Sequence, residues 1–157
     1  IVEPVLLLGA AALATRRLAR LRTPLLSIAV RYAYALVPLG FGVWLAHYAF
    51  HLLTGIATVI PVVQLALQDV GWPVLGRPDW SYGGMSSEAV VPIEFGFLAL
   101  GLSGSIAVAW RLAGDDLPER PLRAALPWMT LAIVLALVAG WLLLQPMEMR
   151  GTFLGPS

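Results

Sequence analysis

Cysteine and lysine are both absent from this sequence of 157 residues, and histidine occurs only twice. Without cysteine, the chain cannot form a disulfide, a thiolate metal site or a cysteine-ligated iron–sulfur cluster of its own. Charge is also sparse, because only 12% of the residues are charged, against about 25% in a typical soluble domain. Together with 59% hydrophobic residues and a mean hydropathy of +0.83, this composition indicates an integral membrane protein.

Four apolar segments predict how the chain crosses the membrane. They are residues 2–14, 32–54, 91–112 and 127–145. The last three are long enough as helices to cross a hydrocarbon layer of about 30 Å, whereas the first is too short. Because the chain starts with Ile1 inside an apolar run, we expect its amino terminus to be processed or truncated. The sequence therefore predicts one all-α integral membrane domain over residues 1–157, with three full transmembrane helices and a partial N-terminal span.

The loop 55–90 is the one long connection in this topology. Within it, the run IPVVQLALQDVGWP predicts a short amphipathic helix in the membrane interface, with Gln64 and Gln68 on one face. The run GRPDWSYGGMSS that follows is typical of turns. In the second span, Pro38 predicts a kink.

Small residues predict where the helices meet each other. Gly42 and Ala46 lie four residues apart in the second span. Gly101, Ser105 and Ala109 repeat the same spacing in the third span. Such ridges let two backbones approach closely in a membrane, so we expect both to lie against other helices.

The placement of arginine predicts the orientation of the chain. Eight of the ten arginines precede the second span or lie between the third and fourth spans. These are Arg16, Arg17, Arg20, Arg22, Arg31, Arg111, Arg120 and Arg123. Since positive residues stay on the cytoplasmic side, we expect the loop 55–90 and the carboxyl terminus to be periplasmic in a bacterial inner membrane. Acidic residues are more frequent on the outer side, which would attract a basic electron carrier such as a small c-type cytochrome. The alternative is that these acids only serve solvation and topology control.

The two histidines lie one helical turn apart in the run WLAHYAFHLL of the second span. Ionisable groups at membrane depth usually face protein, because exposure to hydrocarbon costs several kcal/mol. We therefore expect both imidazoles to face protein or a bound cofactor. Glu94 in the third span and the carboxyl-terminal methionines are expected on the same side of the membrane. The candidate site residues are His47, His51, Trp44 and Glu94 for a cofactor, and His47, His51, Met147 and Met149 for a metal ion.

Four interpretations of these residues stay open. A haem with two histidine ligands needs imidazoles on opposite faces of the iron. This chain would therefore have to share the haem with another subunit that supplies the second histidine. A copper ion would suit histidine with methionine, and a zinc ion would suit histidine with glutamate. A quinol site would use His51 and Glu94 to accept protons, with Trp44 beside the ring. In the fourth interpretation the histidines only hydrogen-bond their neighbours.

The runs RYAYALVPLGFGVWLAHYAFHLLTG and QPMEMRGT resemble the membrane portion of bacterial polyferredoxin-type proteins, which carry 4Fe-4S clusters. The resemblance covers residues 31–55 and part of the carboxyl-terminal tail, and it includes no motif with a known chemical role. Because this chain has no cysteine, it departs from the cluster-binding pattern of that family. The resemblance implies redox membrane biology and assigns no functional residue.

These observations predict a membrane-integral subunit of a larger respiratory or photosynthetic electron-transfer complex. We expect it to anchor other membrane subunits, to contact lipid, and to contribute to a haem or quinone pocket in the outer leaflet without being catalytic alone. The alternative is a metal-handling or transport protein that uses the pair His47 and His51. No phosphate-binding loop or nucleic-acid-binding motif is present in the sequence.

Overall fold

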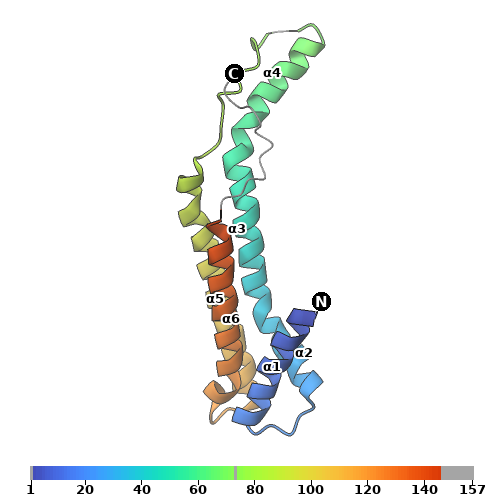
Figure 1. The fold of residues 1–157 in the computed structure, drawn as a ribbon, viewed down its shortest axis with the longest axis vertical. Helices are drawn as coiled ribbons and strands as arrows, with labels where there is room; N and C mark the ends of the chain where they lie inside the picture. The colour runs from blue at the N-terminus through green and yellow to red at the C-terminus, as the bar shows by residue number, and fades with distance from the viewer. Residues whose placement is uncertain (1, 73, 146–157) are drawn as a thin grey trace.

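The computed structural model describes residues 2–72 and 74–145, and all regular secondary structure in these two ranges is helical (Figure 1). The α-helices are α1 (Val2–Leu18), α2 (Leu25–Ala33), α3 (Val37–Gly55), α4 (Val59–Asp69), α5 (Ser87–Asp116) and α6 (Pro121–Leu143). Two short 3-10 turns, Tyr34–Leu36 and Ile56–Thr58, join α2, α3 and α4 end to end. The result is one rod of 45 residues beside the pair formed by α5 and α6.

Three helical segments are long and apolar enough to cross a membrane, as the sequence predicts. They are Leu25–Asp69, Ser87–Asp116 and Pro121–Leu143. The shortest has 23 residues, which corresponds to about 34 Å at 1.5 Å per residue. The outward faces of these helices carry many exposed large apolar side chains, among them Leu100, Leu137 and Trp141. An all-helical bundle with an apolar exterior is what a membrane protein requires.

Several helices differ from the predicted segments, and α5 extends beyond residues 91–112 at both ends. Helix α1 continues to Leu18, because basic residues in its last turn suit the negative end of the helix dipole. Helix α6 begins at Pro121, so Pro127 lies inside it and does not start it. The predicted amphipathic helix is present as α4, but it continues the direction of α3 and projects beyond the ends of α5 and α6 (Figure 1). Pro61 does not break the rod, since it falls in the first turn of α4, where a missing N–H is tolerated.

Helices α3 and α5 touch through their backbones. A Cβ atom added to Gly42 would lie 2.6 Å from the carbonyl oxygen of Phe97, and one added to Gly101 would lie 2.8 Å from the carbonyl oxygen of Pro38. Ala46 and Ala109, on the same two ridges, are fully buried. The prediction that these small residues face other helices is confirmed.

A buried hydrogen bond joins the same two helices. The Leu39 N–H donates to Ser105 Oγ over 2.9 Å. Leu39 lies in the first turn of α3, where backbone N–H groups have no partner within the helix. The 3-10 turn directly before Pro38 creates this new helix start, so Ser105 provides the acceptor that the interrupted helix lacks.

The helix ends that carry the eight arginines lie together at one end of the molecule, opposite α4 (Figure 1). There Arg31 forms ion pairs with Asp116 at 3.1 Å and with Asp115 at 3.7 Å. The buried rings of Tyr32 and Trp128 stack with centroids 5.6 Å apart, which ties α2 to α6. Helix α1, the predicted partial span, packs against α2 and α6 at this end.

The segment before α5 docks on the end of α3. The Gly84 and Met85 N–H groups donate to the carbonyl oxygens of Thr54 and Leu53, over 3.1 and 2.8 Å. These carbonyls become available because the regular α-helix ends at Gly55. The Leu53 and Thr54 carbonyl oxygens lose their helical hydrogen bonds at the change to a 3-10 turn, and the Gly84–Met85 segment supplies new donors for them.

The loop also attaches to α4 through Gln64. The Gln64 side-chain amide donates to the Leu75 carbonyl oxygen, and its oxygen accepts from the Asp79 N–H, over 2.9 and 3.0 Å. Hydrogen bonds from Ser81 lower the pKa of the exposed Asp79 carboxyl. The polar face predicted for α4 thus binds its own loop.

Changing Gly84 to alanine is expected to release this docked segment. The new Cβ would collide with the Leu53 carbonyl oxygen and lie 2.5 Å from the Thr54 carbonyl carbon, so two hydrogen bonds worth about 1 kcal/mol each would be lost. Hydrogen–deuterium exchange of the loop in detergent should rise roughly thirtyfold for a loss of this order. In Gly83→Ala, where nothing lies within 4 Å of the new Cβ, exchange should stay unchanged. Equal exchange in the two variants would contradict the docking.

Candidate functional site

Glu94 lies on the buried face of α5. Its relative exposure is 1%, and it is the only buried charged side chain in the described parts of the chain. The residues one turn away on the same face, Val90 and Leu98, are buried and apolar. The spacing of three or four residues places Glu94 on the face of α5 that packs inside the bundle, against α3 and α6.

The carboxyl group of Glu94 is incompletely satisfied. Its Oε1 atom is inaccessible to solvent and has no hydrogen-bond partner in the structure as described. An isolated buried carboxylate costs several kcal/mol, so evolution usually keeps one only where it has a role. Glu94, which the sequence predicts as an intramembrane acid, is therefore the strongest candidate for a functional residue among the described residues.

His47, on α3, lies within electrostatic range of the Glu94 carboxyl group. The His47 side chain is half-buried. Their approach follows from the packing one to two turns away, where Gly42 and Gly101 hold the two helices together. The structure thus brings together two of the predicted site residues from segments that are far apart in the sequence.

His51 and Trp44 lie on the outer side of α3. The rings of His47 and His51 are perpendicular, with centroids 4.8 Å apart. Trp44 contacts Tyr48 at 4.6 Å, and both are about half exposed. His51 is also exposed. We call the continuous set His47, His51, Tyr48 and Trp44 the aromatic face of α3.

Five residues spaced three or four apart along this helix, Gly40, Trp44, His47, His51 and Thr54, do not share one environment. Thr54 is buried and His47 is half-buried, whereas Gly40, Trp44 and His51 are exposed in this chain. Helix α5 covers the face with Leu39, Gly42 and Ala46, which is rotated away from these five residues. His47 lies at the boundary of the two faces, between Ala46 on the buried face and Tyr48 on the exposed one.

The described part of the chain supplies two ligands for a metal ion. Two imidazoles one helical turn apart can chelate one ion. No group of three or more histidine, aspartate or glutamate side chains gathers as a metal site within residues 2–72 and 74–145. Met147 and Met149, the predicted sulfur ligands, lie outside the described residues. A complete metal site would need these methionines or ligands from a partner.

A haem with two histidine ligands does not fit this chain alone. His47 and His51 project from one helix one turn apart, so they cannot reach opposite faces of one iron. The chain has no third histidine. A haem at this position would therefore take its second imidazole from another subunit.

Some of the packing lies beyond the reach of sequence patterns. The Tyr32–Trp128 stack and the Leu39–Ser105 hydrogen bond join residues from different helices. No local motif pairs them, although the aromatic and small side chains at these positions are visible in the sequence.

The chain matches no known protein family, and no curated protein or solved structure is significantly similar to it.

Proposed function

We propose that this protein is a membrane-integral subunit of a larger electron-transfer complex, and that α3 and α5 contribute one wall of a quinone pocket. The observation that carries the proposal is the buried carboxyl group of Glu94 near His47, whose Oε1 atom has no hydrogen-bond partner among the described residues. A carboxylate next to an imidazole can accept a proton and pass it on. The aromatic face of α3, directly beside this pair, offers Trp44 and His51 to a flat ring.

In this function, oxidation of one quinol releases two protons and two electrons. The proton acceptors are Glu94 and the imidazoles of His47 and His51. The electrons pass to a redox centre held by another subunit, because this chain has neither cysteine nor a complete set of haem ligands. The protein therefore binds and deprotonates the quinol and depends on its partner for electron transfer.

The exposed surface of α4 supports membership in a complex. This helix projects beyond α5 and α6 (Figure 1), and its side chains Val59, Val62 and Val63 are exposed. Other membrane subunits and lipid are the partners that cover such surfaces. We place the site in the outer leaflet of a bacterial inner membrane, where the acidic loop would attract a basic periplasmic electron carrier.

Replacing His51 with leucine is expected to reduce the quinone content of the purified complex about tenfold, because the ring would lose one hydrogen bond worth about 1.4 kcal/mol. The side chain is exposed, so folding and insertion should be unaffected. Tyr34→Leu is the matched control, since Tyr34 is an exposed polar aromatic residue near the other end of the same rod. Normal quinone content and turnover in His51→Leu would overturn the proposed role.

A second candidate function is metal handling or transport, and the imidazole pair with centroids 4.8 Å apart favours it. Elemental analysis of the purified protein separates the two functions. Stoichiometric copper or zinc that disappears in the double variant His47→Ala/His51→Ala would support the metal function. Bound quinone without a metal ion would support the electron-transfer subunit.

A further inference from the structure

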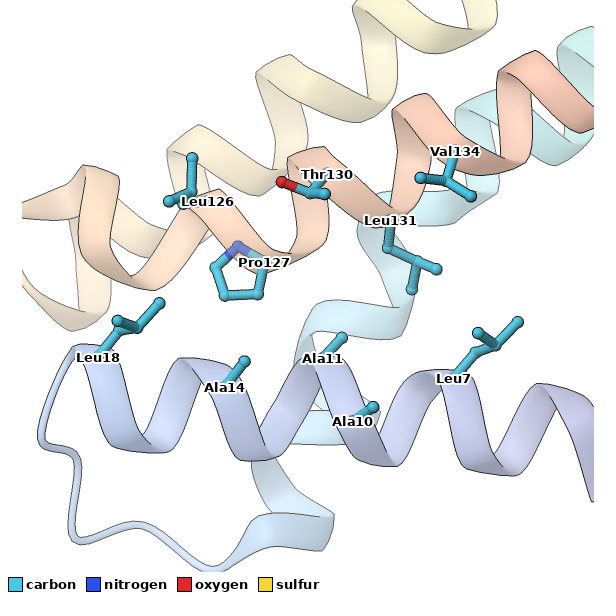
Figure 2. Close-up of a pocket in the computed structure, with 10 residues that line it drawn as sticks. All are labelled: Leu7, Ala10, Ala11, Ala14, Leu18, Leu126, Pro127, Thr130, Leu131 and Val134. Carbon is cyan, nitrogen blue, oxygen red and sulfur yellow. The ribbon is translucent and has the colours of Figure 1, made fainter.

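Helices α1 and α6 leave an open apolar groove between them. Its volume is about 440 Å³, within the range of about 300–1,000 Å³ that is typical of ligand pockets. Figure 2 shows Ala10 and Ala14 on α1 opposite Leu126 and Val134 on α6. The small alanine side chains keep the groove open, and Thr130 is the only polar side chain drawn along it.

A second cavity continues this groove at the arginine-rich end of the molecule. It has a volume of about 420 Å³, and Arg17, Arg20 and Arg123 line it. Leu18 and Leu126 line both cavities, so the two lie next to each other. The combined site is therefore apolar along the helices and cationic at the helix ends.

The three arginines of this cavity have no acidic partner among the described residues. The ion pairs found in those parts of the chain belong to Arg31, which takes both Asp115 and Asp116. Three exposed guanidinium groups that line one cavity make it positively charged, which favours an anion there. Arginine also presents paired N–H donors that fit the oxygens of a phosphate group.

The backbone at Arg20 is a second, independent observation. Its φ angle is +53°, in the left-handed region that favours glycine. The residue follows the end of α1, where the Leu21 N–H donates back to the Arg16 carbonyl oxygen over 3.1 Å, an arrangement in which glycine is the usual residue. Arg20 therefore occupies a position where glycine would be less strained. The Arg20 side chain lines the cationic cavity.

We propose that this site binds one anionic phospholipid, with its phosphate on Arg17, Arg20 and Arg123 and one acyl chain in the groove between α1 and α6. The junction of a cationic cavity at the helix ends with an apolar groove along the helices matches the two halves of a phospholipid. Soluble phosphate would use only the cationic half. The proposal requires membrane insertion but does not depend on the proposed quinone site.

The test is a lipid titration of the full chain purified in dodecyl maltoside, followed by native mass spectrometry and thermal unfolding. We expect phosphatidylglycerol to bind one molecule per chain and to raise the Tm, and phosphatidylcholine with the same acyl chains to do neither. In the variant Arg17→Gln/Arg20→Gln/Arg123→Gln, the affinity for phosphatidylglycerol should fall roughly a hundredfold, since each arginine near a headgroup contributes about fivefold. The variant Arg22→Gln/Arg111→Gln/Arg120→Gln removes the same charge outside the cavity and should keep the affinity.

Two single variants separate lipid binding from folding. Arg20→Gly should keep or raise the Tm without lipid, because glycine suits the left-handed backbone, and should still weaken phosphatidylglycerol binding. Ala14→Phe should block the acyl chain and weaken the lipid without removing any charge. The proposal is overturned if phosphatidylcholine binds equally well, if inorganic phosphate alone gives the same rise in Tm, or if the two triple variants lose affinity equally.

Discussion

Gly101→Leu is expected to separate α3 from α5 and to lower the free energy of unfolding by about 3 kcal/mol, the upper end of the usual cost of overpacking. A Cβ at this position would lie 2.8 Å from the Pro38 carbonyl oxygen and 3.1 Å from the Gly42 Cα. Both obstacles are backbone atoms, which cannot rotate away as a side chain can. Unfolding of the purified protein in detergent, followed by circular dichroism against denaturant, measures the loss.

Gly96→Leu is the matched control for this variant. Gly96 lies on the same helix, is exposed, and has no atom within 4 Å of an added Cβ. Leucine is also the better helix former, so the control should be as stable as the original protein or slightly more stable. If the two variants unfold at the same denaturant concentration, the close contact between α3 and α5 is wrong.

Glu94→Leu is expected to make the protein more stable and the complex inactive. The change removes a buried carboxyl group that lacks a full set of hydrogen bonds and puts an apolar side chain of similar length among Val90 and Leu98. A buried polar group without a hydrogen-bond partner costs about 1–3 kcal/mol, and the change to leucine removes that cost. Turnover of the complex with quinol should fall at least about a hundredfold, because proton acceptance by a positioned side chain contributes ~10²–10⁴.

Two comparisons distinguish a proton acceptor from a structural residue. Glu94→Gln keeps the shape and a hydrogen-bonding group but cannot accept the proton, so it should be as inactive as the leucine variant. Glu88→Gln changes an exposed acid in the first turn of the same helix and should leave both stability and turnover nearly unchanged. Full turnover in Glu94→Gln would assign the side chain to packing alone.

A groove between two helices, such as the one between α1 and α6, cannot be derived from either helix separately. The arginines around residues 16–22 predict orientation through their position in the chain, and the same reasoning applies to Arg123. Their convergence on one cavity depends on the docking of α1 against α6, which the Thr15 hydroxyl supports by donating to the Ala124 carbonyl oxygen over 3.3 Å. That contact spans more than a hundred residues of sequence, and no local pattern contains it.

The sequence by itself determined the helical class, the three long apolar segments and the small residues at helix contacts. It also determined that an acid, Glu94, lies within the apolar segment of residues 91–112. Composition and helical periodicity are local properties, so they can be seen without a fold. The tertiary structure alone decided which face of α3 meets α5, and hence that His47 approaches Glu94 while His51 remains exposed. In an apolar helix every face is compatible with lipid, so hydrophobicity cannot select the buried one. The backbone contact between Gly42 and Gly101, from segments nearly sixty residues apart, makes that selection.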